Sequence, residues 1–265
     1  MFLILKRLWQ VNWAEQWQYR ANLIMYLLYW LVSPIIYLAV WTSIANSKGS
    51  VNGFTANDFI TYYMTLLIVD QITSNIVLHT FAYKVQDGSL SSELIRPIHP
   101  MLTNTLVNNV AFKVFTILGL IPIWIVLFFL FQPDYSSLTW QGIVLSIPAM
   151  VLGFFIAFLI SASVTSVAFW TTRVWSISEF YFAVVLLFSG QFVPLTLMPQ
   201  IIQEIARYLP FQLLLYYPIQ LILGKLTTAE IVEGFVVGLV WLPISILLFN
   251  WVWREGLKRY SAVGA

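Results

Sequence analysis

The sequence contains no cysteine and very few charged residues. Without cysteine there are no disulfides and no thiolate metal sites. Charged residues make up 9% of the 265 positions, whereas a soluble domain carries about 25%. So few charges cannot cover a surface that faces water, and we expect lipid to be the solvent for most of the chain. The hydrophobic content of 60% and the mean hydropathy of +0.84 agree.

Sequence motifs for common enzyme classes are also missing. The segment Ile222–Thr227 contains a Gly-Lys pair, but Leu226 replaces the Ser/Thr of a phosphate-binding loop and no glycine lies five residues before Gly224. The only histidines are His79 and His99, which makes a histidine-rich metal or haem site a poor prediction. A Gly-x-Ser-x-Gly elbow and a His-Glu-x-x-His motif are absent. The sequence therefore predicts neither ATP hydrolysis by this chain nor another enzyme activity, and the net charge of +2 gives no indication of nucleic-acid binding.

Long apolar segments define the expected fold. A helix needs about 20 mainly apolar residues to cross about 30 Å of hydrocarbon. Six segments qualify: about Ala21–Ile44, Phe59–Thr80, a stretch within Val107–Phe131, about Gly142–Thr171, a segment that starts near Ser178 and covers Phe180–Val193, and about Ile231–Trp253. We predict an all-α polytopic membrane protein with six transmembrane helices. The third and fourth are longer than a bilayer requires, so we expect them to project into water or to tilt.

The first 20 residues have their own pattern. Leu5, Trp9, Trp13 and Trp17 recur every four positions, as along one face of a helix. We expect an amphipathic helix in the membrane interface, with tryptophan at headgroup depth. A frayed start of the first span is the alternative. No small-residue cleavage site follows, so a removed signal peptide is not expected.

The distribution of basic residues predicts the orientation. Nine Lys and Arg residues lie on the side of the N-terminus: Lys6, Arg7, Arg20, Lys84, Arg96, Arg173, Arg254, Lys258 and Arg259. Three lie on the other side: Lys48, Arg207 and Lys225. Positive charge marks the cytoplasmic side of a membrane protein, so we expect both termini in the cytoplasm. Lys113, near the cytoplasmic start of the third span, is interpreted as a lysine that reaches back to the interface.

A proline-rich region follows the fifth span. Pro194, Pro199, Pro210 and Pro218 make one continuous helix unlikely, because proline removes a backbone donor and restricts the residue before it. The sequence between Pro199 and Pro210 predicts a short amphipathic helix. Irregular backbone inside a membrane must be buried in protein or face a water-filled cavity. We therefore predict a re-entrant helical hairpin, over about residues 194–224, that enters from the outside.

A polar group lies midway along the second predicted span. It consists of Asp70 and Gln71, with Ser74 one turn further on. A charge at the bilayer centre costs about 2.5–3.5 kcal/mol on insertion scales, so such a residue usually faces a protein interior or a cavity. Two interpretations stay open: a contact with substrate or at a subunit seam, and an internal hydrogen-bonded clasp.

The most distinctive segment is the polar loop Val85–Pro100, "VQDGSLSSELIRPIHP", between the second and third spans. Together with "SGQFVPLTLMPQIIQEIARYLP" before the last span, the amphipathic start and the end "WREGLKRYSAVGA", it resembles the permease subunits of ABC-2 type transporters. The resemblance covers nearly the whole chain. It implies that residues 1–20 form a connecting helix and that residues 21–265 form a six-helix transmembrane domain.

The resemblance also assigns a role to the polar loop. In the family this loop forms a coupling helix, here about residues 87–96, which docks into a groove on an ATPase subunit. Gly88 would permit a sharp entry, Asp87 or Ser89 would cap the helix, and Pro97 would end it. Leu90 and Leu94, with Ile95 as a third, would fill a hydrophobic cleft, and Glu93 and Arg96 would form ion pairs at its rim. A solvated loop is the alternative.

The function implied by the resemblance is that of a permease subunit in an ATP-driven exporter. Expected partners are two ABC ATPase subunits, which would bind ATP and Mg²⁺, and a second permease, identical or similar; no cofactor, metal or nucleic acid is expected on this chain. The expected location is the plasma membrane, the inner membrane of a bacterium. Aromatic richness and Asp70 favour hydrophobic or cationic small molecules as substrates, with lipid-like compounds as another class. A secondary transporter, which would need more coupling carboxylates and an internal repeat, and a membrane scaffold are the alternatives.

Overall fold

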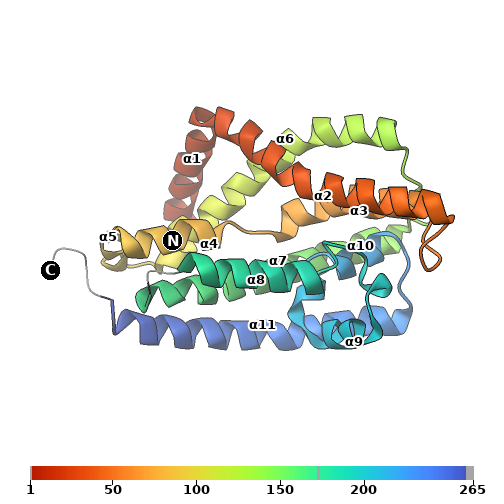
Figure 1. The fold of residues 1–265 in the computed structure, drawn as a ribbon. Helices are drawn as coiled ribbons and strands as arrows, with labels where there is room; N and C mark the ends of the chain where they lie inside the picture. Colours follow the sequence, from red (N-terminus) through yellow and green to blue (C-terminus); the bar gives the residue numbers. More distant parts are fainter. Residues whose placement is uncertain (1, 172–173, 261–265) are drawn as a thin grey trace.

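The computed structural model describes residues 2–171 and 174–260, and this part of the chain is helical throughout, without strands (Figure 1). Arg173 and the last residues of the predicted transmembrane domain, 261–265, lie outside the described residues. So do the side chains of His79 and Thr80. The all-helical expectation is confirmed for the part that is described.

Four helices are long and apolar enough to cross a membrane. They are α2 (Arg20–Lys48), α6 (Val107–Phe131), α7 (Trp140–Ser166), which continues into the 3-10 turn η2 (Val167–Phe169), and α11 (Thr228–Leu257). A shorter apolar helix, α8 (Val174–Phe188), lies beside them. Each of the five overlaps one of the six predicted spans. The chain is thus a multi-pass membrane protein.

The second predicted span is not one continuous helix. It consists of α3 (Ala56–Thr73) and α4 (Val77–Gln86), separated by residues 74–76. Ser74 adopts an extended backbone and its N–H still donates to the carbonyl of Asp70, while the Asn75 side chain accepts from the N–H of Val77 at 3.3 Å. Ser and Asn side chains compete with the helical hydrogen bonds of the backbone. Their position in the middle of the segment explains the interruption.

The first predicted helix is separate from the first span. Helix α1 (Phe2–Gln18) ends before Tyr19 and lies across the direction of the long helices (Figure 1). Its tryptophans are not simply turned outward. Trp9 stacks on Trp13 at 5.9 Å, and Trp13 and Trp17 both pack against Phe115 of α6, at 5.6 and 5.2 Å between ring centroids. The tryptophan stripe therefore fixes α1 to α6.

The proline-rich region forms four short pieces. These are the 3-10 turn η3 (Leu195–Leu197), α9 (Gln200–Tyr208), the 3-10 turn η4 (Pro210–Leu213) and α10 (Tyr216–Ile222). The predicted short helix is confirmed as α9, with Pro199 directly before it and Pro210 after it. The interruption of the region by its prolines is therefore also confirmed.

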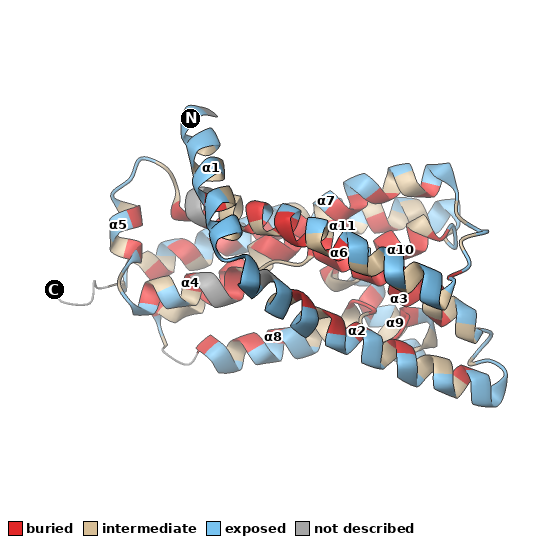
Figure 2. Cartoon of the chain, turned by 90° about the horizontal axis from the view of Figure 1, so that it is seen from above, coloured by how far each residue is buried: buried red, intermediate tan, exposed pale blue. Residues whose placement is uncertain are grey.

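Helix α7 forms the centre of the packing. It contacts α11, α10, α4 and α3. Two glycines let the irregular pieces approach it closely: a Cβ at Gly142 would collide with the carbonyl of Leu221 in α10, and one at Gly153 with the carbonyl of Leu213 in η4. In contrast, α1 and the outer side of α2 are mostly exposed (Figure 2). The exposed side chains of α2 are largely apolar, as expected for a helix that faces lipid or a second membrane subunit, whereas those of α1 are mixed apolar and charged.

Candidate functional site

The polar loop lies at one end of the molecule, the same end as the C-terminal end of α11 (Figure 1). It contains one short helix, α5 (Leu90–Leu94), and this helix is shorter than the coupling helix predicted over about residues 87–96. Gly88 has φ +79°, a left-handed conformation in which glycine is strongly favoured. The Asp87 carboxylate accepts the Ser89 N–H at 2.9 Å, and hydrogen bonding from the side chain and then the N–H of Ser89 holds the pKa of Asp87 below its usual value. The Ser89 side chain makes no capping hydrogen bond.

The loop is fastened to its own chain from two sides. Leu90 is fully buried in a cluster with Phe81 and Val85 of α4. Glu93 pairs with Lys84 of α4 at 2.9 Å between Oε1 and Nζ, so this carboxylate is engaged within the chain. These contacts make α4 and α5 one packed unit.

The second fastening comes from the C-terminal segment. The Tyr260 hydroxyl lies 2.9 Å from Ser91 Oγ and donates to the carbonyl of Gly88 at 3.3 Å. Its ring packs against Phe169, with 5.7 Å between the ring centroids. No periodicity or spacing in the sequence connects position 260 to the loop, so this contact was not predicted.

The outward side of the loop carries different residues from those expected. Ile95 is 87% exposed, and Arg96, Pro97 and Ser92 are also exposed, whereas Leu94 is half-buried. Of the three predicted cleft-filling residues, Ile95 is therefore the one on the surface, and Leu90 is part of the core of this chain. Leu90 lies two residues after the tight bend at Gly88, where the chain turns back toward α4, and its side chain packs against that helix.

A large cavity opens in the middle of the molecule. Its volume is about 840 Å³, and its walls come from α2, α3, the 74–76 interruption, α7 and α8. Asp70 and Ser74 line it, as the interpretation of a substrate contact requires. Two further polar groups in the wall are Glu179 of α8 and Ser161 of α7. Glu179 was not identified from the sequence, because the predicted fifth span started near Ser178 and left it at the edge, whereas α8 starts at Val174.

Lys113 lies inside the protein and does not reach back to the interface. Its side chain is 9% exposed, so the interpretation from the sequence is wrong. Its Nζ donates to the carbonyl of Gln71 at 2.8 Å and to Ser74 Oγ at 3.3 Å, and lies 5.4 Å from the centre of the Phe154 ring. A cation at the C-terminal end of a helix interacts favourably with the last carbonyls. Lys113 therefore holds the end of α3 at the interruption.

Asp70 is 6% exposed and lies in the field of Lys113. The indole of Trp30 approaches it, but Oδ2 of Asp70 forms no hydrogen bond of standard geometry with the residues that the structure describes. Burial of a charged group without full hydrogen bonding is costly. Asp70 Oδ2 can thus accept a hydrogen bond at the wall of the cavity.

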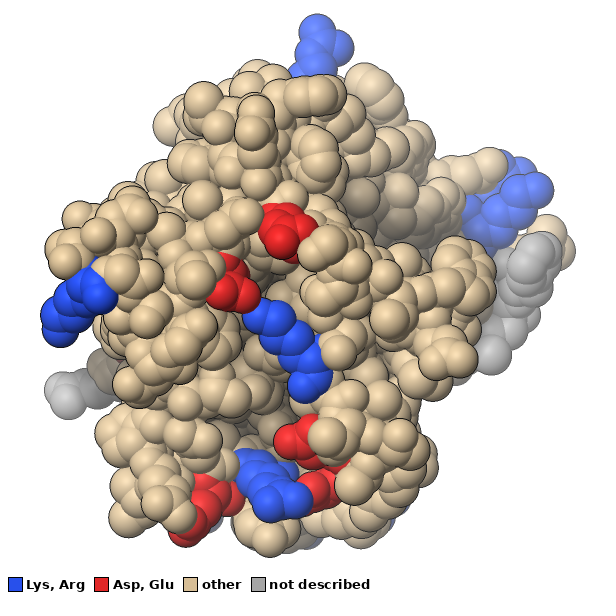
Figure 3. Space-filling model, turned by 90° about the vertical axis from the view of Figure 1, so that its right-hand side faces the viewer, with Lys and Arg blue, Asp and Glu red and all other residues tan. Residues whose placement is uncertain are grey.

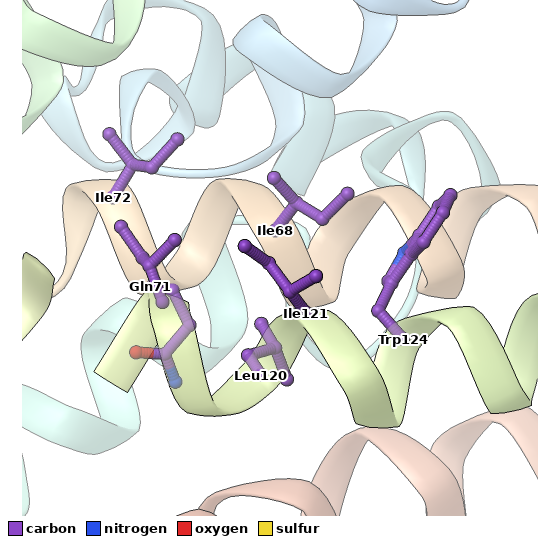
Figure 4. A pocket seen from close by; sticks show the side chains of 7 residues that line it. Ile68, Gln71, Ile72, Leu120, Ile121 and Trp124 are labelled. Carbon is purple, nitrogen blue, oxygen red and sulfur yellow. The ribbon is translucent and has the colours of Figure 1, made fainter. Parts of the chain in front are cut away.

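Gln71 points to a different place from Asp70. It lines a smaller apolar pocket of about 130 Å³ between α3 and α6 (Figure 4). The figure shows its amide beside Leu120 of α6, with Ile68 and Ile72 of α3 nearby. The predicted group of three is therefore divided: Asp70 and Ser74 face the large cavity, and Gln71 faces this pocket.

The opposite end of the molecule carries paired charges next to the proline-rich region (Figure 3). Lys225 Nζ lies 2.9 Å from Asp58 Oδ1 at the start of α3, and Arg207 of α9 forms a two-pronged ion pair with Glu233 of α11. The predicted residues Pro194, Pro199 and Pro210 border these pieces. Ion pairs thus connect α9 to α11 and the turn after α10 to α3.

Comparison with known proteins now gives the family. The family model of the ABC-2 family transporter proteins matches residues 21–264. No curated protein matches the chain. The match starts with the first long helix and includes the polar loop, the proline-rich region and the last helix. Because it covers far more than half of the sequence, this chain belongs to the ABC-2 family of transporter proteins.

Proposed function

We propose that this chain is the permease subunit of an ATP-driven exporter, which forms the translocation pathway with a second permease and receives force from two ATPase subunits that bind ATP and Mg²⁺. The family is one of membrane subunits that associate with ABC ATPases. The observation that carries the proposal is the loop at one end of the molecule, in which exposed Ile95 and Arg96 project from a turn that is fastened to α4 and to Tyr260.

The proposed topology has six crossings: α2, the α3–α4 pair, α6, α7, α8 and α11. The end that carries α5 is cytoplasmic, with both termini, and α9 and α10 form the re-entrant region at the outer side. Lys84, Arg96 and Arg254 lie on the proposed cytoplasmic side, in agreement with the rule for positive charges. The crosswise direction of α1 supports an interfacial, connecting role for it. A bacterial inner membrane is the proposed location.

Force would pass from the ATPase into two helices. Ile95, Arg96 and Pro97 would contact the ATPase, while Leu90 and the Lys84–Glu93 pair transmit its movement to α4. Helix α4 joins α3 at the interruption, where Lys113 of α6 holds the helix end. A movement of the loop therefore reaches the wall of the large cavity through few intermediate contacts.

The pathway would form at a seam between two permeases. Helices α2, α3 and α8 provide much of the wall of the 840 Å³ cavity, and the exposed apolar side of α2 lies next to it. These correspond to the first, second and fifth proposed crossings. Hydrophobic or cationic small molecules, or lipid-like compounds, are the proposed substrates.

The experiment is co-purification with the ATPase. We expect Ile95→Asp to reduce recovery of an ABC ATPase with the tagged permease at least fivefold, because a charge would face the apolar part of the contact. Ile201→Asp is the matched control, because Ile201 is also an exposed isoleucine, 67% exposed, and lies on α9 at the other end. Absence of any ATPase in the wild-type preparation would refute the proposal, and would favour a secondary transporter or a scaffold.

A further inference from the structure

The large cavity has the dimensions of a small-molecule site. Pockets for drug-sized ligands measure about 300–1,000 Å³ and combine apolar walls with a few polar groups. At about 840 Å³ this cavity lies in that range, and its lining is mainly apolar and aromatic. Among the described residues that line it, Asp70 and Glu179 are the charged ones, and both are acidic.

The two carboxylates are available in different ways. Asp70 is almost completely buried and keeps an oxygen without a standard hydrogen bond. Glu179 is exposed to the cavity and forms no ion pair with any side chain that the structure describes. A carboxylate in a membrane-embedded wall is expensive unless a positive charge compensates it. The wall therefore has a place for a cation that the described side chains do not fill.

The local charges indicate how many positive charges fit. Lys113 acts on Asp70 from behind the wall, where its ammonium is held by Gln71 and Ser74. Two carboxylates and one ammonium leave a net charge of −1 in this region. One added positive charge neutralises it, whereas a second would remain uncompensated at low dielectric.

The aromatic residues of the wall indicate the kind of cation. Tyr26 and Trp30 of α2, Phe112 of α6 and Tyr181 of α8 border the same space. Aromatic faces attract cations, most strongly where water is excluded, and they also accommodate flat apolar groups. A small hydrated metal ion would use neither the volume nor these faces.

We propose that the cavity between α2, α3, α7 and α8 binds an amphiphilic organic cation with a single positive charge, and that Glu179 together with Asp70 provides its counter-charge. Asp70 is the deeper carboxylate and Glu179 the accessible one. The proposal specifies the substrate class of the exporter and so rests on the proposed function, but binding itself needs neither ATP nor the ATPase.

The test measures binding to the full chain in nanodiscs of zwitterionic lipid. Ethidium is the probe, followed by fluorescence anisotropy, with empty nanodiscs subtracted. We expect Glu179→Gln to raise the ethidium Kd about tenfold, which equals about 1.4 kcal/mol, and Glu179→Asp to stay within about threefold of wild type. Glu204→Gln, a carboxylate of α9 outside the cavity, is the matched control and should not change the Kd.

Ligand charge gives the second arm. Tetraphenylphosphonium should displace ethidium, tetraphenylborate of the same shape should not, and propidium, the dication with the same ring system, should bind no more tightly than ethidium. Equal Kd values for wild type and Glu179→Gln, or equal competition by the cation and the anion, would overturn the inference. Failure here with the ATPase still co-purifying removes the cation site alone, whereas loss of the ATPase contradicts the proposed function whatever ethidium does.

Discussion

Replacement of Lys113 by methionine tests how the interruption between α3 and α4 is maintained. Methionine keeps the length of the side chain but removes the ammonium, which donates to Gln71 O at 2.8 Å and to Ser74 Oγ at 3.3 Å. A hydrogen bond to a charged group contributes about 1.5–3 kcal/mol. The buried Asp70 carboxylate also loses the nearby positive charge. We expect the free energy of unfolding to fall by about 3 kcal/mol, near the low end of the 3–5 kcal/mol range for breaking a buried charge pair.

The assay is reversible unfolding in mixed detergent micelles, followed by tryptophan fluorescence. The double variant Lys113→Met/Asp70→Asn completes a double-mutant cycle, since it removes both charges together. We expect it to recover at least 1 kcal/mol relative to Lys113→Met alone. If the single variant is as stable as wild type, Lys113 does not hold the end of α3, and if the double variant recovers nothing, Lys113 does not compensate Asp70; either result refutes that part of the reasoning.

Two further predictions concern the ends of the molecule. Tyr260→Phe removes the hydroxyl that contacts Ser91 Oγ and the Gly88 carbonyl. We expect the attachment of the polar loop to lose about 1 kcal/mol of stability, which limited proteolysis would detect as faster cleavage within residues 86–97. Unchanged cleavage would show that Tyr260 does not hold the loop. The Arg207–Glu233 ion pair connects α9 to α11, and both side chains are partly exposed, so we expect it to contribute modestly to the attachment of α9. Hydrogen exchange of α9 should therefore be faster in Glu233→Gln than in wild type; unchanged exchange would exclude the pair as an attachment of α9.

The positions of most helices could be predicted from composition and hydrophobic length. The third span was predicted to lie within Val107–Phe131, and α6 fills this stretch, because a single apolar stretch between polar residues has no competing structure in lipid. The prolines at 199 and 210 likewise defined α9. The interruption after Thr73 was not predicted. Ser74 and Asn75 favour a break but also occur within helices, and the contact with Lys113 that stabilises the end of α3 comes from a distant part of the sequence.

The candidate sites were predicted less completely. Asp70 could be identified because an acidic residue in the middle of an apolar segment is easily recognised in the sequence alone. Glu179 could not, since it lies near the end of its helix in the sequence, and only the packing of α8 beside α2 and α3 brings it to the same cavity. In the sequence, Leu90 and Ile95 were both apolar residues of the polar loop, and the fold made Leu90 a core residue and Ile95 a surface residue.

By itself the sequence determined the solvent, the helical class and the family, since these depend on hydrophobicity, segment length and local motifs. The tertiary structure decided which side chains meet. It turned Lys113 inward to the end of α3, connected Tyr260 to the polar loop and placed Glu179 opposite Asp70. The physical reason is that burial and electrostatic compensation depend on distances between helices. The sequence pattern shows which residues share one face of a helix, but it does not show which other helix packs against that face.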